Sequence, residues 1–430
     1  MPRTPHRPDR RQLLTALACT AATGLMANPA HAGDDERTPP TPPATRGALV
    51  PIGGALRFDN DAVWSRLVGL AGGHDSRWLV IGLASSHPEQ SASQTADVLR
   101  GHGAHVAPLL FGTGAEAAAK ARDAGLVARI RGCSGVFFCG GAQERIVDVL
   151  NPGGVATPVL DAIRAVPSRG GVVAGTSAGA AVMSTTMFRD AQDSMAVLHG
   201  HLREGREIDH GLGLVGPGLF VDQHFLKRGR IGRMLPMMAA RGYTMGLGVD
   251  ENSAAIITGD QVEVIGAKGA LLVDLSGAWT APRDGAFALR GAKLSYLDRG
   301  DRYDLSARRL IPSPQKQAGQ AIRPNAAGFE PYYAHTRFWS DMLGDTAIVN
   351  AMTELIDSAD REAFGLAATL GPRREAACPD LAFEFRLYKG GDSLGWFTGE
   401  FGGEDYTVAN LYLDVVPVRL TLPVYRPWSA

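Results

Sequence analysis

The chain has 430 residues, of which 45% are apolar and 20% are charged. This length suggests two domains or one large one, and the composition excludes disorder as the dominant state. The 43 Lys and Arg residues nearly balance the 44 Asp and Glu residues, which leaves a net charge of −1. Because nucleic-acid binding needs a basic surface, this balance argues against a nucleic-acid partner.

The first 32 residues have the features of an export signal. Arg10 and Arg11 form a twin-arginine pair, an apolar stretch runs from Leu13 to Ala27, and Ala30-His31-Ala32 offers an A-x-A cleavage site. The apolar stretch is shorter than the roughly 20 residues that a membrane-spanning helix needs. We therefore expect residues 1–32 to be a twin-arginine signal, the mature protein to be periplasmic or secreted, and no segment to span a membrane.

After a Thr- and Pro-rich linker at residues 33–46, short apolar runs alternate with Ala-rich amphipathic segments. The apolar runs predict buried strands at Trp78–Ala84, His105–Leu110, Gly135–Cys139 and Gly170–Ala174, and the amphipathic segments predict helices at Ala92–His102, Ala115–Ile130 and Ala142–Leu150. This alternation is typical of a parallel sheet covered on both faces by helices. We therefore expect an α/β fold, a three-layer sandwich with a mostly parallel central sheet.

The pattern changes toward the C-terminus. Residues 311–331 are rich in Pro, Gln and Ala and predict a second linker, so the main domain covers residues 47–310. The remaining segment, residues 332–430, predicts a small α+β region of unknown role. Its expected elements are a helical stretch at Thr336–Ala368 and strands near Ala382–Lys389, Tyr406–Val415 and Val418–Tyr425.

Two groups of residues could suggest a metal or disulfide site. Cys133, Cys139 and Cys378 are an odd number in the mature chain and lack metal-ligand spacing, so we expect neither a disulfide framework nor a zinc site. His199 and His201 are more simply interpreted as solvated loop residues than as ligands. The sequence predicts no metal site.

The main candidate for catalysis is Ser177, within Gly175-Thr176-Ser177-Ala178-Gly179. This G-x-S-x-G motif suits a serine exposed on a sharp turn, since glycines two residues away on either side let the backbone close beneath it. The motif alone is weak, but a predicted strand precedes it and a helix start follows it. Ser177 is thus a candidate nucleophile, with a structural turn as the alternative.

A serine nucleophile needs a base and a carboxylate to orient that base. His224 lies near the end of the apolar run Leu219–Phe225, and the strand Gly246–Asp250 leads directly into Glu251. The order Ser, His, Glu differs from the Ser, acid, His order of α/β-hydrolases. Only His335 could complete the latter order, and it lies beyond the second linker, which disfavours an ordinary esterase.

Two further segments of the sequence suggest how a substrate would be held. Lys227–Arg233 contains three arginines and a lysine, which form either a solvated charged face or a pocket for substrate carboxylates. A Gly140-Gly141 turn follows a predicted strand, and such a turn can direct backbone N–H groups at a developing oxyanion.

These motifs together resemble the cyanophycinases, serine peptidases related to the aspartyl dipeptidases and, in fold, to class I glutamine amidotransferases. The resemblance rests on Gly-Gly-Ala-Gln-Glu-Arg at 140–145, Gly-Thr-Ser-Ala-Gly-Ala at 175–180, Asp-Gln-His-Phe with Arg-Gly-Arg-Ile-Gly-Arg at 222–233, and Gly-Val-Asp-Glu at 248–251. It covers about residues 49–305, and the leader and C-terminal region make the secreted form of the family the closer match.

The resemblance implies a secreted exopeptidase that acts on cyanophycin, a polyaspartate with an arginine joined through each β-carboxyl, and releases β-Asp-Arg dipeptides through an acyl-enzyme. It implies that Ser177 is the nucleophile, His224 the general base and acid, and Glu251 the orienting carboxylate. The residues at the family's substrate-pocket positions are Gln143, Asp222, Gln223, Arg228, Arg230 and Arg233. We place the oxyanion against the N–H groups of Ala178 and Gly141 and expect no metal or cofactor.

Several alternatives stay open. A related aspartyl or isoaspartyl dipeptidase would share the three catalytic residues, and a secreted non-catalytic protein could bind the polymer without cleaving it. A homodimer is compatible with the sequence. The connection between Met187 and Gly211 is longer and more charged than in compact relatives, and could form a lid that changes substrate choice.

Overall fold

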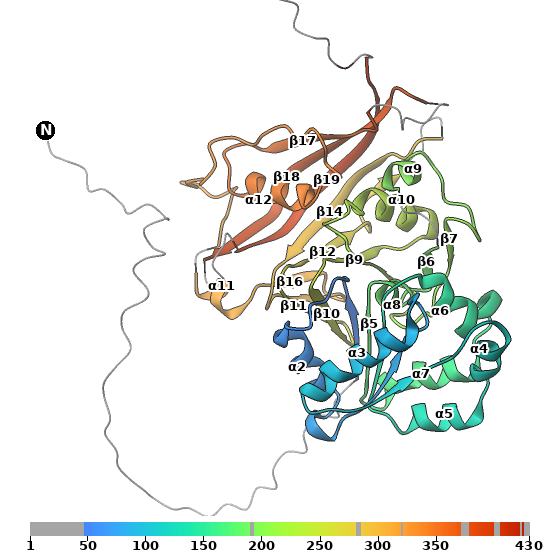
Figure 1. The fold of residues 1–430 in the computed structure, drawn as a ribbon. Helices are drawn as coiled ribbons and strands as arrows, with labels where there is room; N and C mark the ends of the chain where they lie inside the picture. The colour runs from blue at the N-terminus through green and yellow to red at the C-terminus, as the bar shows by residue number, and fades with distance from the viewer. Residues whose placement is uncertain are drawn as a thin grey trace, which may run out of the picture.

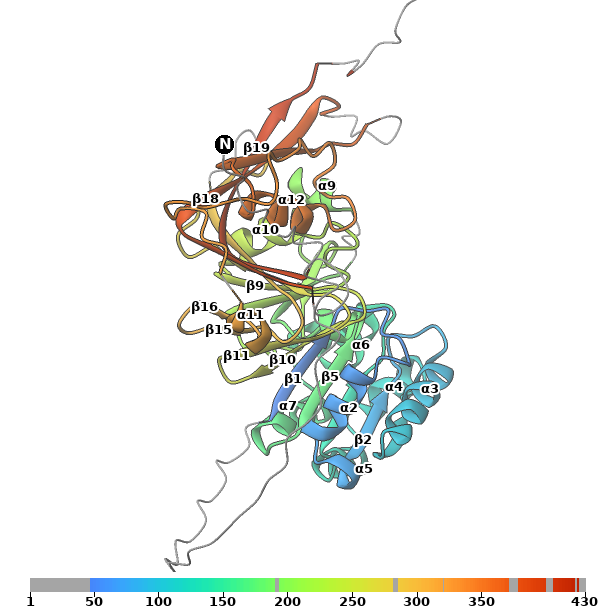
Figure 2. The same cartoon turned by 90° about the vertical axis from the view of Figure 1, so that its left-hand side faces the viewer.

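The computed structural model describes residues 47–189, 193–280, 285–319, 321–370, 378–399, 405–421 and Val424. The predicted export signal at 1–32 and the first linker at 33–46 lie outside the described residues. Among the helices in these ranges, none has the length and apolarity to cross a bilayer. Figures 1 and 2 show two sheets that meet at the middle of the molecule.

The first sheet has a parallel half and an antiparallel half. Within the described ranges its nine strands run in the order β16 (Arg309–Ile311), β15 (Arg302–Asp304), β11 (Gln261–Gly266), β10 (Ser253–Thr258), β1 (Ala48–Ile52), β5 (Val172–Thr176), β4 (Gly135–Phe138), β2 (Arg77–Ile81) and β3 (His105–Leu109). The strands from β1 to β3 pair in parallel, and β10 joins β1 antiparallel.

Helices cover both faces of the parallel half, because its strands are apolar on both sides. Along β2, Trp78 and Val80 pack with the helices α2 (Asp61–Leu70) and α3 (Pro88–Gly101). The alternate residues Leu79 and Ile81 face the opposite layer. That layer consists of α4 (Gly114–Lys120), α5 (Ala124–Arg131), α6 (Gln143–Leu150) and α7 (Pro158–Ser168). The predicted α/β class and its three layers are confirmed.

The second sheet extends into the C-terminal part of the chain. Its strands run in the order β17 (Glu362–Ala367), β18 (Leu381–Thr398), β19 (Asp405–Arg419), β14 (Leu289–Leu297), β12 (Ala270–Asp274), β9 (Met245–Val249) and β8 (Leu219–Asp222), with β13 (Trp279–Thr280) beside β14. The long β18–β19 pair lies beside β14 in Figure 1. One face of this sheet packs against α9 (Ser194–Leu198), α10 (Ile231–Arg241) and α12 (Ala347–Ile356).

The two sheets share a core. Leu247 and Val249 on β9 pack against Ala255 and Ile257 on β10. The chain passes from the second sheet to the first between β9 and β10, over residues 250–252. Because this crossing is only three residues long, it keeps the end of β9 in the second sheet close to the start of β10 in the first.

The structure differs from the sequence expectations in three places. The separate strand expected near Val418–Tyr425 is absent from its described part, because Val418 and Arg419 form the end of β19 and Leu420 and Thr421 lie in no strand; residues 422, 423 and 425 lie outside the described residues. The helix expected at Ala115–Ile130 is split into α4 and α5, because the Asp123 side chain accepts a hydrogen bond from the Leu126 N–H and caps a new helix. The helix expected at Thr336–Ala368 is instead the shorter α12 followed by the strand β17, whose burial alternates residue by residue.

A buried ionic cluster joins the predicted second linker to the C-terminal strands. The segment 311–331 contains the short helix α11 (Pro314–Ala318), in which Lys316 is fully buried. The Lys316 Nζ atom lies 2.8 Å from Asp298 Oδ2 and 2.7 Å from Thr407 Oγ1 on β19. Burial raises the pKa of Asp301, and the Lys316 ammonium group opposes that rise.

We expect Lys316→Ala to lower the free energy of unfolding by about 3–5 kcal/mol, because it leaves buried carboxylates without their cation. Denaturant titration of both proteins measures this difference. The matched control is Lys120→Ala, which removes a half-exposed pair with Glu116 and should cost about 1 kcal/mol or less. Equal losses of unfolding free energy in the two variants would contradict the conclusion that Lys316 pairs with buried carboxylates.

Candidate active site

The strand β5 ends in a sharp turn at Ser177, which is half-buried. Ser177 has φ 53° and ψ −109°, a conformation that non-glycine residues rarely adopt, and the helix α8 (Ala178–Ala181) begins immediately after it. A Cβ atom on Gly175 would lie 2.4 Å from the Gly179 carbonyl oxygen, and one on Gly179 would lie 2.6 Å from the Phe138 carbonyl oxygen. The two glycines of the motif are therefore required by close backbone packing.

His224 lies beside Ser177 although the two follow strands in different sheets. The distance from Ser177 Oγ to His224 Nε2 is 2.9 Å. His224 also has a positive φ of 46°, and its backbone N–H donates to the Gly53 carbonyl oxygen at 2.6 Å. The imidazole packs on Gly54, where a Cβ atom would lie 2.3 Å from His224 Cε1. Gly53 and Gly54 thus hold the ring in place from the end of β1.

Glu251 completes the arrangement from the crossing between the sheets. Its Oε1 atom lies 2.6 Å from His224 Nδ1. The next residue, Asn252, has φ 56° and donates its N–H to the Gly54 carbonyl oxygen at 2.8 Å. Asparagine tolerates this left-handed conformation better than most residues. The same turn therefore positions both the carboxylate and the glycine behind the imidazole.

The environment of His224 favours the neutral imidazole. Burial lowers its pKa, the bond to Glu251 opposes this, and the charges of Arg228 and Arg230 lower it further. A neutral imidazole that donates from Nδ1 to Glu251 leaves Nε2 free to accept the Ser177 proton. The site can therefore activate a serine at neutral pH.

The two N–H groups expected to bind an oxyanion have no acceptor in the described parts of the chain. Neither the Ala178 N–H nor the Gly141 N–H donates a hydrogen bond there. A Cβ atom on Gly140 would lie 3.2 Å from Ser177 Cβ, and Gly141 has φ 141° with its Cβ position 2.0 Å from the Ala84 carbonyl oxygen. Side chains at either position would crowd Ser177 or displace the turn.

The six expected substrate-pocket residues fall into different environments. Asp222 and Arg233 are buried and bind each other, with Nε to Oδ2 at 2.8 Å and Nη2 to Oδ1 at 2.5 Å. The Arg233 guanidinium also lies 4.3 Å from the centre of the Phe188 ring. Because their charges are engaged with each other, we infer that this pair positions the site. Arg228 is exposed beside His224.

Arg230 and Gln223 carry buried polar atoms that the described residues leave unpaired. Arg230 is 3% exposed, and its Nη1 donates to the Gln223 carbonyl oxygen at 2.8 Å while its Nε has no partner. Burial and the nearby Arg233 lower the pKa of Arg230 to about 9, which still leaves it charged at neutral pH. Gln223 Oε1 is likewise without a partner. A buried polar atom without a partner lowers the stability of the fold by about 1–3 kcal/mol. Such atoms are expected where a bound ligand supplies the missing partner.

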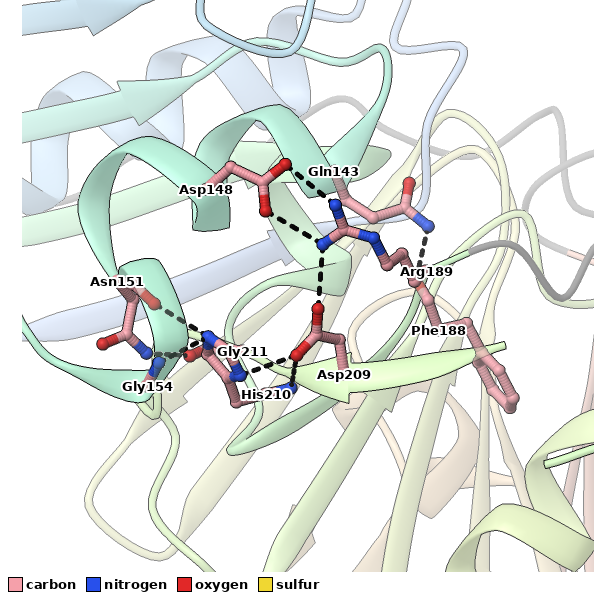
Figure 3. Close-up of polar contacts among 9 residues, drawn as sticks. All are labelled: Gln143, Asp148, Asn151, Gly154, Phe188, Arg189, Asp209, His210 and Gly211. Atoms are coloured by element: carbon pink, nitrogen blue, oxygen red, sulfur yellow. Dashed lines mark hydrogen bonds and ion pairs between the residues drawn. The ribbon is translucent and has the colours of Figure 1, made fainter. Parts of the chain in front are cut away.

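The sixth residue, Gln143, connects the pocket to the segment suspected of being a lid. Its Nε2 donates to the Phe188 carbonyl oxygen at 2.7 Å. Next to Phe188, Arg189 binds both oxygens of Asp148 on α6 at 2.9 Å and one oxygen of Asp209 at 2.8 Å, as Figure 3 shows. The part of the segment that the structure describes is thus tied to α6.

The far end of this segment is also anchored. The strands β6 (Thr186–Phe188) and β7 (Ile208–His210) pair antiparallel. His210 Nδ1 lies 2.6 Å from Asp209 Oδ1, and its Nε2 lies 2.7 Å from the Asn151 carbonyl oxygen, as seen in Figure 3. Residues 190–192 lie outside the described ranges. His199 and His201 join no group of metal-binding side chains within those ranges.

Sequence reasoning missed Gly53, Gly54 and Asn252. A Gly-Gly pair directly after the first buried strand was the available signal, since two glycines at a strand end permit close approach of another group. Nothing in the sequence indicated that this group would be His224, because the contact joins segments about 170 residues apart.

Comparison with known proteins identifies the class and then the family. Residues 53–265 match the model of Peptidase family S51. The chain is 32% identical over 282 residues to a cyanophycinase of Nostoc sp., a match that covers 64% of this chain and 90% of the relative, and 28% identical over 275 residues to one of Synechococcus elongatus, covering 60% and 80%. A crystal structure of a peptidase from an acI-B1 Actinobacterium is similar at 19% identity and a TM-score of 0.45, over 61% of this chain and 98% of that one.

These matches define a serine-type peptidase. More particularly, the chain belongs to peptidase family S51, the family of the cyanophycinases. Membership confirms the resemblance found in the sequence and the fold that it implied.

We expect Gly54→Ala to lower kcat about a hundredfold or more, because the new methyl group would displace the His224 ring and a 1 Å displacement can cost that much. Steady-state kinetics test this, and circular dichroism checks that the variant is folded. Gly69→Ala is the matched control, since open space surrounds that position. Unchanged kinetics in Gly54→Ala would mean that the ring has room to move.

The lowered pKa of His224 predicts the pH profile. Protonated His224 cannot accept the Ser177 proton, so kcat/KM should fall as the pH falls through this pKa, with an acid limb below the ordinary histidine value of about 6.5. Arg228→Gln removes one charge that lowers the pKa and should move the limb toward higher pH. A limb that moves the other way would contradict the electrostatic account.

Proposed function

We propose that the protein is an exported exopeptidase that hydrolyses cyanophycin and releases β-Asp-Arg dipeptides through an acyl-enzyme. The observation that carries this proposal is the continuous set of contacts from Ser177 through His224 to Glu251, at 2.9 and 2.6 Å. The names of the relatives supply the substrate class, since the matched proteins are cyanophycinases.

In this mechanism Ser177 Oγ attacks a backbone carbonyl carbon of the polymer while His224 Nε2 takes its proton. The negative charge that develops on the carbonyl oxygen is stabilised by the N–H groups of Ala178 and Gly141. His224 then gives its proton to the leaving amine. Water, activated by His224, attacks the acyl-enzyme and restores Ser177.

The charges beside His224 suit the substrate. Each repeat of cyanophycin presents a guanidinium group and a free α-carboxylate, so its pocket needs groups of both kinds. The Arg230 guanidinium is the type of donor that matches a carboxylate, and the Gln223 amide oxygen is the type of acceptor that matches a guanidinium; each residue has one buried polar atom without a partner in the described chain. We place the released dipeptide on this side of Ser177, next to β8 and α10, with Arg228 at its exposed margin.

Export is proposed on the sequence alone. The twin-arginine pair Arg10 and Arg11, the apolar stretch and the A-x-A site support it. Such a route delivers a protein that is already folded, in agreement with two buried cysteines, Cys133 and Cys139, that form no disulfide.

The decisive experiment incubates the purified protein with cyanophycin and analyses the soluble product by mass spectrometry. We expect β-Asp-Arg from the parent, a loss of at least about a thousandfold in Ser177→Ala, and a similar loss in His224→Ala, because triad residues act as a unit. Arg230→Ala should mainly weaken polymer turnover. Ser93→Ala, an exposed serine on α3, is the control and should retain activity.

The same assay separates the competing functions. Cleavage of free aspartyl or isoaspartyl dipeptides with the polymer left intact would instead identify a dipeptidase. Binding of the polymer without any product would identify a non-catalytic binding protein. Polymer hydrolysis that persists in Ser177→Ala would contradict the mechanism.

A further inference from the structure

A cavity opens on the same sheet edge as Ser177. Its volume is about 700 Å³, within the roughly 300–1,000 Å³ of small-ligand sites. It lies between α3, α4 and α6, at the carboxyl ends of β2 and β3. Its floor is apolar and includes Leu109, Phe111 and Ala117, all nearly fully buried.

This cavity is separated from the nucleophile by the Gly140-Gly141 turn. The strands β5, β4, β2 and β3 are consecutive neighbours in the sheet, and Ser177 follows β5. Adjacent strands are about 4.8 Å apart, so the end of β2 lies about 10 Å from that of β5. The cavity is on the opposite side of Ser177 from β8 and α10, where Gln223 and Arg230 lie.

The rim of the cavity carries charges of both signs. Arg145 donates from Nη1 to the Ser85 carbonyl oxygen at 3.1 Å, which leaves its other donors available. Asp148 is engaged by Arg189 through two bonds of 2.9 Å. The remaining carboxylate, Glu89, has no ion pair or hydrogen bond with the rest of the described chain. One cation and one anion are therefore open to a ligand.

We propose that this cavity binds an arginyl-aspartate unit in the retained part of the polymer while the terminal dipeptide is cleaved. The inference rests on the proposed function. The apolar floor matches the methylene groups of the arginine arm, Glu89 pairs with its guanidinium, and Arg145 pairs with its α-carboxylate.

The geometry sets the length of substrate that reaches the cavity. An extended backbone covers at most about 3.3–3.6 Å per residue, so about three residues connect the cleaved bond with the end of β2. Substrates with two repeats cannot fill both sites, whereas those with about five repeats can. Catalytic efficiency should therefore rise between these lengths and level off beyond them.

The test compares kcat/KM for synthetic substrates of two and six repeats in the parent, Glu89→Gln, Arg145→Gln and the double variant. The ion pairs of Glu89 and Arg145 with the substrate lie at an exposed rim, where each pair is weak. We therefore expect the ratio of kcat/KM for six repeats to kcat/KM for two repeats to fall about threefold to fivefold in each single variant and about tenfold or more in the double variant. Asp75→Asn, an exposed acid at the opposite end of β2, is the control and should keep the parent ratio.

A companion measurement removes catalysis from the comparison. Sedimentation with cyanophycin measures the binding of Ser177→Ala with and without Glu89→Gln, and the added substitution should weaken binding. Thermal unfolding verifies that Glu89→Gln, in the first turn of α3, leaves the protein folded.

The outcomes distinguish the two proposals. A parent protein that releases no dipeptide would overturn the proposed function and this site with it. A parent that releases the dipeptide, together with a double variant whose ratio stays within twofold of the parent value, would overturn this site alone.

Discussion

The contact between Ser177 and His224 depends on backbone conformations that most residues avoid. Both residues have positive φ, and each such backbone conformation lowers the stability of the folded protein by on the order of 1–3 kcal/mol. The surrounding structure maintains them through close backbone packing at Gly175, Gly179 and Gly54. The free energy of folding therefore holds the Ser177 hydroxyl and the His224 imidazole within hydrogen-bond distance of each other.

The arrangement of the two sheets gives this contact its precision. Ser177 follows a strand of the first sheet, His224 follows a strand of the second, and Glu251 lies where the chain passes between them. The C-terminal strands extend the second sheet and pack with α10, which carries Arg233. The described C-terminal strands thus help to hold α10, and with it the Asp222–Arg233 pair, in place.

The sequence predicted what depends on local patterns. The strands β2, β3 and β4 and the turn at Ser177 were found because apolar runs and G-x-S-x-G spacing are local signals, and the three catalytic candidates followed from strand ends. The role of Gly54 and the split between α12 and β17 depend on contacts between distant segments. The pairing of Asp222 with Arg233, 11 residues apart, depends on how α10 packs on β8. Arg233 illustrates the limit of sequence reasoning. The sequence showed a positive charge close to His224, but it could not show that the Asp222 carboxylate already binds this charge.

The central claim is that His224, held by Glu251, takes the proton of Ser177. Its most direct test is covalent labelling with a fluorophosphonate, followed by peptide mapping. We predict one label per chain, on Ser177, and labelling at least about a hundredfold slower in His224→Ala. A label on another residue, or an unchanged labelling rate in His224→Ala, would contradict the account.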